Sequence, residues 1–445
     1  MSAESAGGAG NRFDSILTLA FGDTSRNTLL VGAGYAAQAL ASLAATILVS
    51  RSLGPGSFGV FSVALGAATA VAPIAEFGLD AAFLRETSRA HAADDRAGIA
   101  RLLRAYAHWK VAVFSLVGGG AAALAGWAAR HLMRYDHVFL LRMACVGAIG
   151  LNLMKLGRGL LEARGRFKDV AALTAGTAFL RLALVAALIF AAILTPSTVL
   201  IVYLAVPALG IVYALMRSPD IPAFSRIPQG VAAERDRLKA FGVWVGGAAV
   251  IVSLTGYIDT LLLNRWCGAA AVGQYSAASK LAFSLITASF PIATVLLPRA
   301  SAFRSAERVE AFLKKARLLV ALGAAGAGAL WLIAPLAVRL LLGPAYAPSA
   351  TLLRILALGT GFMFAGGPYS MTFYSSGDSR PIAAAALAQF AVLVPALILL
   401  IPRMGAAGAA WAFTVAHAFN FLLLVALARI AVSRMHRAEA AAMSA

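Results

Sequence analysis

The chain has 445 residues, of which 61% are hydrophobic and 13% are charged, whereas a soluble domain is about half apolar and about a quarter charged. A mean hydropathy of +0.82 excludes an ordinary soluble protein, and the strand alternation of an outer-membrane barrel is absent. We therefore predict an all-α integral membrane protein. Cys145 and Cys267 have no partner at metal-ligand spacing, so we expect inert thiols and no metal site.

Apolar windows predict about twelve transmembrane helices in two lobes of six, between polar termini. The predicted N-lobe (27–217) holds helices over 27–50, 56–79, 107–130, 138–157, 170–194 and 198–216. The predicted C-lobe (241–432) holds helices over 241–264, 271–298, 316–342, 349–374, 381–401 and 405–430. Cytosolic tails are expected over 1–26 and 433–445, and a Pro-containing cytosolic linker over 218–240. The loop 85–105 predicts an interfacial helix with Arg101 and Arg104 facing headgroups.

The sequence repeats itself about 214 residues further along the chain. Arg51-Ser52-Leu53-Gly54 matches Arg265-Trp266-Cys267-Gly268, and a later run, Leu140-Leu141-Arg142-Met143, matches Leu352-Leu353-Arg354-Ile355. Two homologous halves in a strongly apolar chain predict a transporter with a site between two lobes. Because each half has an even number of spans, the repeat is parallel, with its pseudo-twofold axis along the membrane normal. Gly54-Pro55 and Gly343-Pro344 predict turns.

Basic residues gather on one side of the predicted topology. Of the 38 Lys and Arg residues, 28 fall on the side of the N-terminus and 8 on the other, while Arg181 and Lys280 lie inside spans. The positive-inside rule therefore places both termini in the cytosol. This distribution accounts for the net charge of +19, so we expect no nucleic-acid partner but an affinity for anionic lipids of the inner leaflet.

Sequence motifs for catalysis and cofactor binding are absent. The chain has no phosphate-binding loop, no Asp-x-Asp, no metal-ligand spacing and no Gly-x-Ser-x-Gly. The predicted outer loops are too short to hold a catalytic domain. These features favour a transporter without a cofactor over an enzyme.

The strongest candidate for substrate binding is Arg181, near the middle of the predicted span 170–194. Arginine does not lose its proton at physiological pH, so it must face water, an anion or a carboxylate. It either lines a hydrated cavity and contacts an anionic substrate, or it pairs with an acid of a neighbouring helix. Lys280 and Asp259 lie on consecutive helices at similar distances from the turn at Gly268. They predict an ion pair, a role in substrate or ion binding, or both.

Two acidic residues lie one turn apart at the cytosolic end of span 56–79. We expect Asp80 to be solvated, whereas the deeper Glu76 is a candidate for proton coupling or for balancing Lys155 or Arg85.

Three repeat-related pairs of arginines lie at helix ends: Arg51 and Arg265, Arg142 and Arg354, and Arg85 and Arg299. They either snorkel and cap loops, or form rings of positive charge at the two mouths of a cavity. Polar residues inside the spans, Gln38, Asn152, Gln389, His417 and Asn420, predict hydrogen bonds between helices. The surplus of basic over acidic groups suits an anionic substrate such as a diphosphate.

Several motifs resemble one transporter family. Arg51-x-Leu53-Gly54-Pro55-x-x-Phe58-Gly59-x-Phe61 and Glu76-Phe77-Gly78-Leu79-Asp80 are similar to the first hairpin of the polysaccharide (oligosaccharide) flippases of the multidrug/oligosaccharidyl-lipid/polysaccharide exporter superfamily. Val272-Gly273-x-Tyr275-x-Ala277-x-x-Lys280-Leu281 and Gly405-x-x-Gly408-Ala409-Ala410 extend the resemblance over roughly residues 25–432.

This resemblance implies two six-helix lobes in a V around a central cavity. It implies transfer of undecaprenyl-diphosphate-linked oligosaccharide to the outer leaflet of a bacterial inner membrane, for O-antigen, capsule or exopolysaccharide, with Arg181 and Lys280 on the diphosphate. Membrane lipids, a polysaccharide polymerase and other assembly proteins are the implied partners. A cation-coupled multidrug exporter that uses Asp259, and a glycan polymerase or ligase, remain as alternatives.

Overall fold

A computed structural model describes residues 23–76, 79–92, 95–162, 164–217, 253–287, 306–375 and 380–444. The predicted linker 218–240, most of the predicted N-terminal tail, parts of the seventh and eighth predicted helices, and Arg299 lie outside the described residues. Within these ranges the chain forms helices and no strands. Nine of the described helices are long and apolar enough to cross a membrane, which confirms an all-α, multi-pass membrane protein.

The helices form two groups. The N-terminal bundle contains α2 (Asp23–Glu76), α3 (Leu79–Ala92), α4 (Arg96–Trp127), the π-helix η1 (Ala128–Met133), α5 (Val138–Glu162), α6 (Phe167–Phe190) and α7 (Pro196–Met216). The C-terminal bundle contains α9 (Ile258–Thr287), α11 (Ala306–Ala337), the π-helix η2 (Val338–Leu342), the 3₁₀ turn η3 (Pro344–Tyr346), α12 (Ser349–Ser375), α13 (Arg380–Met404) and α14 (Ala406–Ser444).

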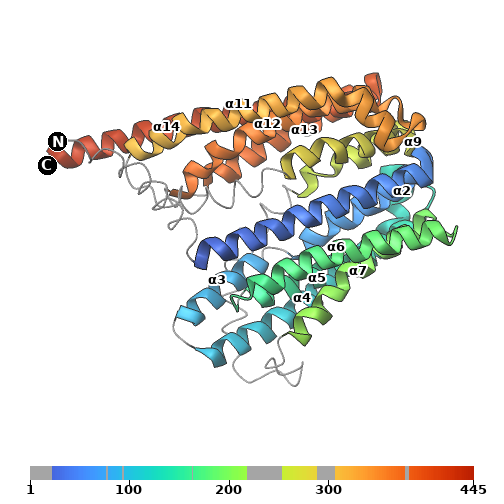
Figure 1. The fold of residues 1–445 in the computed structure, drawn as a ribbon, viewed down its shortest axis with the longest axis horizontal. Coiled ribbons are helices and arrows are strands. Elements are labelled where there is room, and N and C mark those ends of the chain that lie inside the picture. Colours follow the sequence, from blue (N-terminus) through green and yellow to red (C-terminus); the bar gives the residue numbers. More distant parts are fainter. Residues whose placement is uncertain are drawn as a thin grey trace, which may run out of the picture.

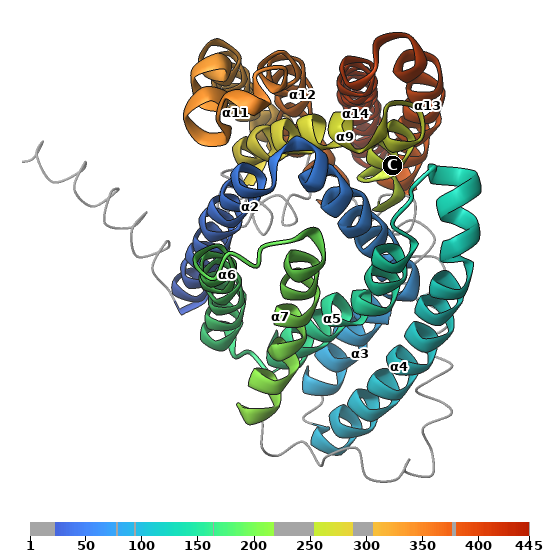
Figure 2. The ribbon, with the colours of Figure 1, turned by 90° about the vertical axis from the view of Figure 1, so that its right-hand side faces the viewer.

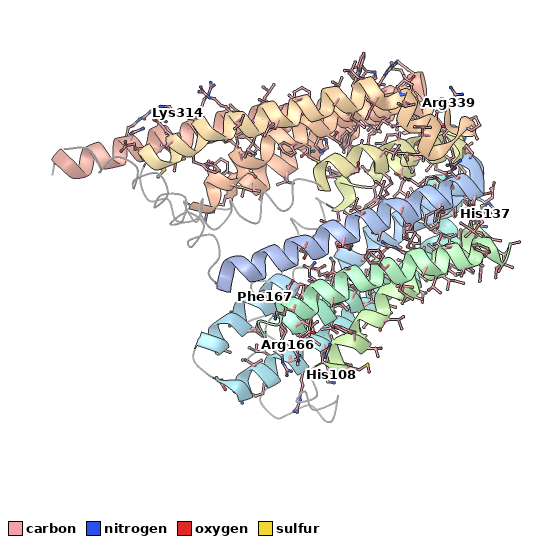
Figure 3. The ribbon with its side chains drawn as sticks, viewed as in Figure 1. His108, His137, Arg166, Phe167, Lys314 and Arg339 are labelled. Carbon is pink, nitrogen blue, oxygen red and sulfur yellow. The ribbon has the colours of Figure 1, made fainter. Side chains whose placement is uncertain are left out.

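The two bundles lie together at one end of the molecule and diverge toward the other, where α14 ends (Figure 1). We call these the closed end and the open end. Seen from the closed end, the kinked α2 forms an arch whose bend lies against α9 (Figure 2). Arg166 and Lys314 mark the open end in the two bundles, and His137 and Arg339 lie near the closed end (Figure 3).

The repeat predicted from the sequence is visible as two equivalent kinks. Gly54 interrupts α2 at φ 69° and ψ 170°, and Gly268 interrupts α9 at φ 78° and ψ 175°. Only glycine adopts such positive φ angles without a steric penalty. The predicted helices 27–50 and 56–79 are therefore the two arms of α2, and the prediction of turns at these positions is confirmed.

The prediction for the loop 85–105 is wrong in detail. The segment contains α3, and α4 begins at Arg96, well before the expected start at residue 107. Asp95 caps α4, because its carboxylate accepts a hydrogen bond of 2.7 Å from the Gly98 amide. Apolar residues Ala82 and Phe83 of α3 pack against Leu102 of α4, so α3 covers the first part of α4.

One hydrophobic core joins the two bundles at the closed end. Phe58 of α2, Val272 and Tyr275 of α9, and Leu353 of α12 belong to the same buried cluster. Away from this core the bundles expose large apolar side chains, such as that of Phe190, which is 94% exposed. An apolar exterior of this extent is the surface expected to face lipid.

Candidate functional site

A cavity of about 750 Å³ lies between the two bundles. Its wall comes from both arms of α2, from α5, α6 and α7 of the N-terminal bundle, and from α9 of the C-terminal bundle. Because the cavity is shared between the bundles, any relative movement of the two changes its shape. Pockets of this size hold small ligands or the headgroup of a larger one.

Arg181 lines this cavity from α6. Its Nη2 donates a hydrogen bond of 2.5 Å to Ser42 Oγ, and its guanidinium lies 4.6 Å from the centre of the Tyr203 ring. Within the described ranges no carboxylate lies within salt-bridge distance of Arg181, and its buried Nε has no hydrogen-bond partner. The charge is held by a hydroxyl and an aromatic face, which leaves donors for an anion.

Lys280 and Asp259 line the same cavity from α9. The Asp259 carboxylate is buried and accepts hydrogen bonds from Tyr275 Oη and from the Thr260 amide. Lys280 is exposed, and its ammonium group does not form a salt bridge with the Asp259 carboxylate. The structure thus places both residues at one site but does not join them in the direct ion pair that their spacing suggested.

The rest of the cavity wall is a mixture of hydroxyl groups and apolar carbon. The hydroxyls come from Ser42, Thr46, Ser62, Thr69, Tyr203, Tyr257, Thr260, Tyr275, Ser276, Ser279 and Ser284. Sequence reasoning missed most of these residues, because a single hydroxyl inside an apolar helix is common and usually bonds to its own backbone. Their spacing along α9, where Ser276, Ser279 and Lys280 share one face, was the available signal.

The closed end is held by reciprocal hydrogen bonds between the bundles. Arg51 Nη1 in α2 donates to the Leu340 carbonyl of η2 at 3.2 Å. Its repeat equivalent, Arg265 in α9, donates to the Leu132 carbonyl of η1 at 3.0 Å and also to the His131 carbonyl. Each arginine therefore caps the carbonyl end of a π-helix in the opposite bundle.

Two further side chains strengthen this contact. Tyr346 Oη donates to the Ser50 carbonyl at 2.9 Å, and Asn264 Nδ2 donates to the Met133 carbonyl at 2.9 Å. Ser50 and Asn264 precede the two arginines at equivalent repeat positions. We call the hydrogen bonds of Arg51, Arg265, Tyr346 and Asn264 the interbundle clasp.

Two glycines bring the backbones of α2 and α9 into contact beside the clasp. A Cβ atom at Gly59 would lie 1.7 Å from the Ala269 carbonyl oxygen, and one at Gly273 would lie 1.9 Å from the Pro55 carbonyl oxygen. Gly59 and Gly273 are repeat equivalents, so the approach is symmetric. Any side chain larger than hydrogen forces the two helices apart.

Two of the remaining arginine candidates, Arg142 and Arg354, lie away from the cavity. Arg142 is exposed near the start of α5, and the Arg354 guanidinium lies 5.0 Å from the centre of the Trp331 ring. Arg85 belongs to α3, and Arg299 is outside the described residues. The structure brings Arg51 and Arg265 to the clasp, and it does not bring Arg142 and Arg354 to the cavity wall.

The acidic pair at the junction of α2 and α3 forms a partly buried network. Glu76 forms a salt bridge with Lys155 of α5, which is one of the alternatives that the sequence left open for it. The expectation that Asp80 is solvated is wrong, because it contacts Lys110 Nζ at 2.5 Å and accepts a hydrogen bond from Tyr106 Oη. Both partners come from α4 and are buried.

Three of the five polar residues predicted to join helices do so, whereas the buried Asn420 Oδ1 has no hydrogen-bond partner. Asn152 Nδ2 of α5 donates to the Ala72 carbonyl of α2 at 3.2 Å, and Gln389 of α13 lies 3.1 Å from His417 of α14. Among the residues that the structure describes, no group of three or more His, Cys, Asp or Glu side chains is arranged to hold a metal ion.

Solved structures share this fold at low sequence identity. An inward-facing multidrug resistance MATE family transporter of the MOP superfamily matches with a TM-score of 0.72 and 16% identity, over 90% of this chain and 96% of that one. The lipid II flippase MurJ in an inward closed conformation matches with a TM-score of 0.74 and 11% identity, over 89% and 87%. An outward-facing MATE family transporter matches with a TM-score of 0.65 and 18% identity, over 93% and 96%.

The search of curated protein sequences gave no match. A family model described as polysaccharide biosynthesis protein matches residues 24–304, which is more than half of the chain and includes Arg181, Asp259 and Lys280. The fold of its structural neighbours is that of transporters and flippases of the MOP superfamily. The chain belongs to the polysaccharide biosynthesis protein family.

Proposed function

We propose that the protein is a flippase for undecaprenyl-diphosphate-linked oligosaccharide, acting in the assembly of O-antigen, capsule or exopolysaccharide. The observation that carries the proposal is Arg181, a permanent cation in the interbundle cavity with no carboxylate partner in the described part of the chain. An unpaired charge at membrane depth is costly, and a bound anion removes that cost. Membership in the polysaccharide biosynthesis family supports a glycan carrier as the source of the anion.

The diphosphate would bind between the bundles. Arg181 belongs to the N-terminal bundle and Lys280 to the C-terminal bundle, so two phosphates of one headgroup can bridge them. A guanidinium offers paired donors to phosphate oxygens, and an ammonium offers a compact charge. The bridging geometry means that substrate binding is sensitive to the angle between the bundles.

The cavity wall is also suited to a sugar. Its serine, threonine and tyrosine hydroxyls both donate and accept hydrogen bonds, which matches the hydroxyl groups of an oligosaccharide. The polyprenyl tail would remain in lipid between the bundles, along their apolar exteriors. We propose no chemical step, because the substrate crosses the membrane with its bonds unchanged.

Transport would proceed by alternating access. In the conformation described here, the interbundle clasp holds one end closed while the other end diverges. The excess of basic residues at the open end supports a cytosolic orientation of that end in a bacterial inner membrane. Release of the clasp and approach of the open ends would then expose the cavity to the outer leaflet, where a polysaccharide polymerase would use the substrate.

The test is export of surface polysaccharide by Arg181 variants in a host that lacks its own copy. Arg181→Ala removes charge-assisted hydrogen bonds worth about 1.5–3 kcal/mol, so we expect a loss of about tenfold to a hundredfold in substrate affinity and a clear loss of export. Arg181→Lys keeps the charge and should retain part of the activity. Arg339→Ala, at an exposed cation near the closed end, is the matched control. Full export by Arg181→Ala at normal abundance would refute this role.

Asp259 favours a second candidate function, a cation-coupled multidrug exporter on the same fold. Its carboxylate lines the cavity, where it can hold a proton or a cationic drug, whereas Glu76 is paired with Lys155 away from the cavity wall. Efflux of cationic dyes from cells expressing the protein, lost in Asp259→Asn, would support this function. If Asp259→Asn instead abolishes glycan export without any dye efflux, Asp259 serves as the ion-coupling residue of the flippase.

A further inference from the structure

We propose that a second pocket, between α11 and α14 near the open end, binds the phosphate headgroup of an anionic phospholipid. This pocket has a volume of about 390 Å³ and lies within the C-terminal bundle, separate from the cavity between the bundles. The proposal concerns a resident lipid and does not depend on which substrate the protein transports.

The faces of α11 and α14 form most of the pocket, and Tyr369 of α12 completes its lining. The face of α11 presents Glu310, Lys314 and Arg317, and the face of α14 presents Arg429 and His436. The residues on α11 are spaced by three or four positions and those on α14 by seven, so on each helix they project from one side. The side chains therefore converge on one space rather than scattering over the surface.

The pocket has an uncompensated positive charge. Its single carboxylate, Glu310, lies 3.1 Å from His436 Nε2. Lys314, Arg317 and Arg429 make no salt bridge with any residue in the described ranges, and each has an exposed side chain. Three cations around one space favour a ligand with several anionic oxygens, and a phosphate group provides them.

The pocket also has an apolar floor at the depth where headgroups lie. Leu313, Val425 and Val432 line it beside the cations, and an acyl chain can follow these side chains into the bilayer. At the helical rise per residue, Arg429 lies about 35 Å along α14 from the start of the helix at Ala406. The hydrocarbon core of a bilayer is about 30 Å thick, so Arg429 reaches the level of the headgroups. A lipid is therefore favoured over a soluble phosphate, because both its parts have matching surfaces.

Among the described residues, the N-terminal bundle does not repeat this arrangement of cations, although the chain is an internal repeat. About 212 residues before Lys314 and Arg317 stand Leu102 and Ala105, which are buried beneath α3. Arg217, which corresponds to Arg429, lies 3.4 Å from the Asp169 carboxylate. The three unpaired cations are thus particular to the C-terminal bundle and are not a general consequence of positive helix ends.

Titration of the purified full chain with phosphatidylglycerol, followed by native mass spectrometry, tests the proposal. Phosphatidylcholine and soluble glycerol phosphate are the comparison ligands. Each cation near a lipid surface contributes about fivefold in affinity, so Lys314→Gln/Arg317→Gln/Arg429→Gln should bind phosphatidylglycerol about a hundredfold more weakly. The matched control, Arg130→Gln/Arg339→Gln/Arg403→Gln, removes three exposed cations near the other end of the bundles and should bind like the wild type.

Preference for phosphatidylglycerol over phosphatidylcholine, lost only in the pocket variant, is the expected result. If the triple variant does not fold, Arg429→Gln alone should lose about fivefold. The proposal is overturned if the pocket variants bind phosphatidylglycerol like the wild type, or if the control loses as much affinity. Equal binding of phosphatidylcholine also overturns it, and equal competition by glycerol phosphate would assign the pocket to a soluble phosphate.

Discussion

Replacement of Gly59 by alanine should open the closed end of the molecule. The new Cβ would lie 1.7 Å from the Ala269 carbonyl oxygen, whereas ordinary carbon–oxygen contacts are above 3 Å. The Ala269 carbonyl oxygen belongs to the backbone of α9, so no side-chain rotation relieves the clash, and α2 and α9 must separate. Overpacking of this kind costs about 1–3 kcal/mol, which changes the ratio of two conformations by a factor of about 5 to 150.

Distances between the open ends report this shift. After both native cysteines are replaced, spin labels are attached at Lys168 of α6 and Ala311 of α11, which are both exposed. Pulsed electron paramagnetic resonance then measures the distance between the labels, and so the separation of the bundles. We expect wild-type protein to show the wide separation and Gly59→Ala to gain a population with a shorter one.

A matched control and a symmetric variant sharpen the measurement. Gly56→Ala changes the same helix arm at a position where no atom lies within 4 Å of the new Cβ, so it should keep the wild-type distances. Gly273→Ala should reproduce the effect of Gly59→Ala, because its Cβ would lie 1.9 Å from the Pro55 carbonyl oxygen. The reasoning is refuted if Gly59→Ala folds, and keeps both the wild-type distances and the wild-type thermal stability.

Three further predictions concern the clasp and the acidic network. Arg51→Ala and Arg265→Ala each remove exposed hydrogen bonds worth about 0.5–1.5 kcal/mol. In the same distance measurement, each should therefore shift the population less than Gly59→Ala does. If both variants keep the wild-type distance distribution, the clasp is contradicted. Lys110→Ala leaves the Asp80 carboxylate without its buried partner and should lower the free energy of unfolding by about 3 kcal/mol, as measured by thermal unfolding. Lys155→Ala, at a cation whose side chain is 42% exposed, should cost less stability. Equal losses in the two variants would count against the network. Burial raises the pKa of Asp80, but the Lys110 charge together with the hydrogen bonds from Lys110 and Tyr106 outweighs burial and lowers the pKa below its ordinary value of 3.8. Stability contributed by ionised Asp80 should therefore persist above about pH 4 and be lost only as the pH falls through the lowered pKa. A loss of stability that begins near pH 6 and is absent in Asp80→Asn would contradict this assignment.

The sequence predicted the parts of this fold that depend on local pattern. Gly54 and Gly268 were recognised as equivalent turns because a glycine repeated at a fixed offset marks a backbone requirement. For Arg181 the sequence left two alternatives, a hydrated cavity or an acidic partner on a neighbouring helix, because a permanent charge in the middle of an apolar span must face water, an anion or a carboxylate. The structure places Arg181 on the cavity wall.

The missed features depend on contacts between distant segments. Asp80 was expected in solvent because its partners Tyr106 and Lys110 follow about 26 to 30 residues later, on a helix whose start was placed too late. The repeat related Arg51 to Arg265, but the sequence did not predict their hydrogen-bond acceptors. These acceptors are backbone carbonyls of π-helices, and every residue type carries the same carbonyl group. A packed arrangement of helices determines both kinds of contact.

The most direct test of the central claim is the leaflet distribution of undecaprenyl-diphosphate glycan in the native host after depletion of this protein, measured together with surface polysaccharide. The account predicts that glycan accumulates in the inner leaflet and that surface polymer is lost, with both defects reversed by the wild type and not by Arg181→Ala. A normal leaflet distribution with normal surface polymer, in cells without a second copy of the protein, would contradict the flippase assignment and favour the drug exporter.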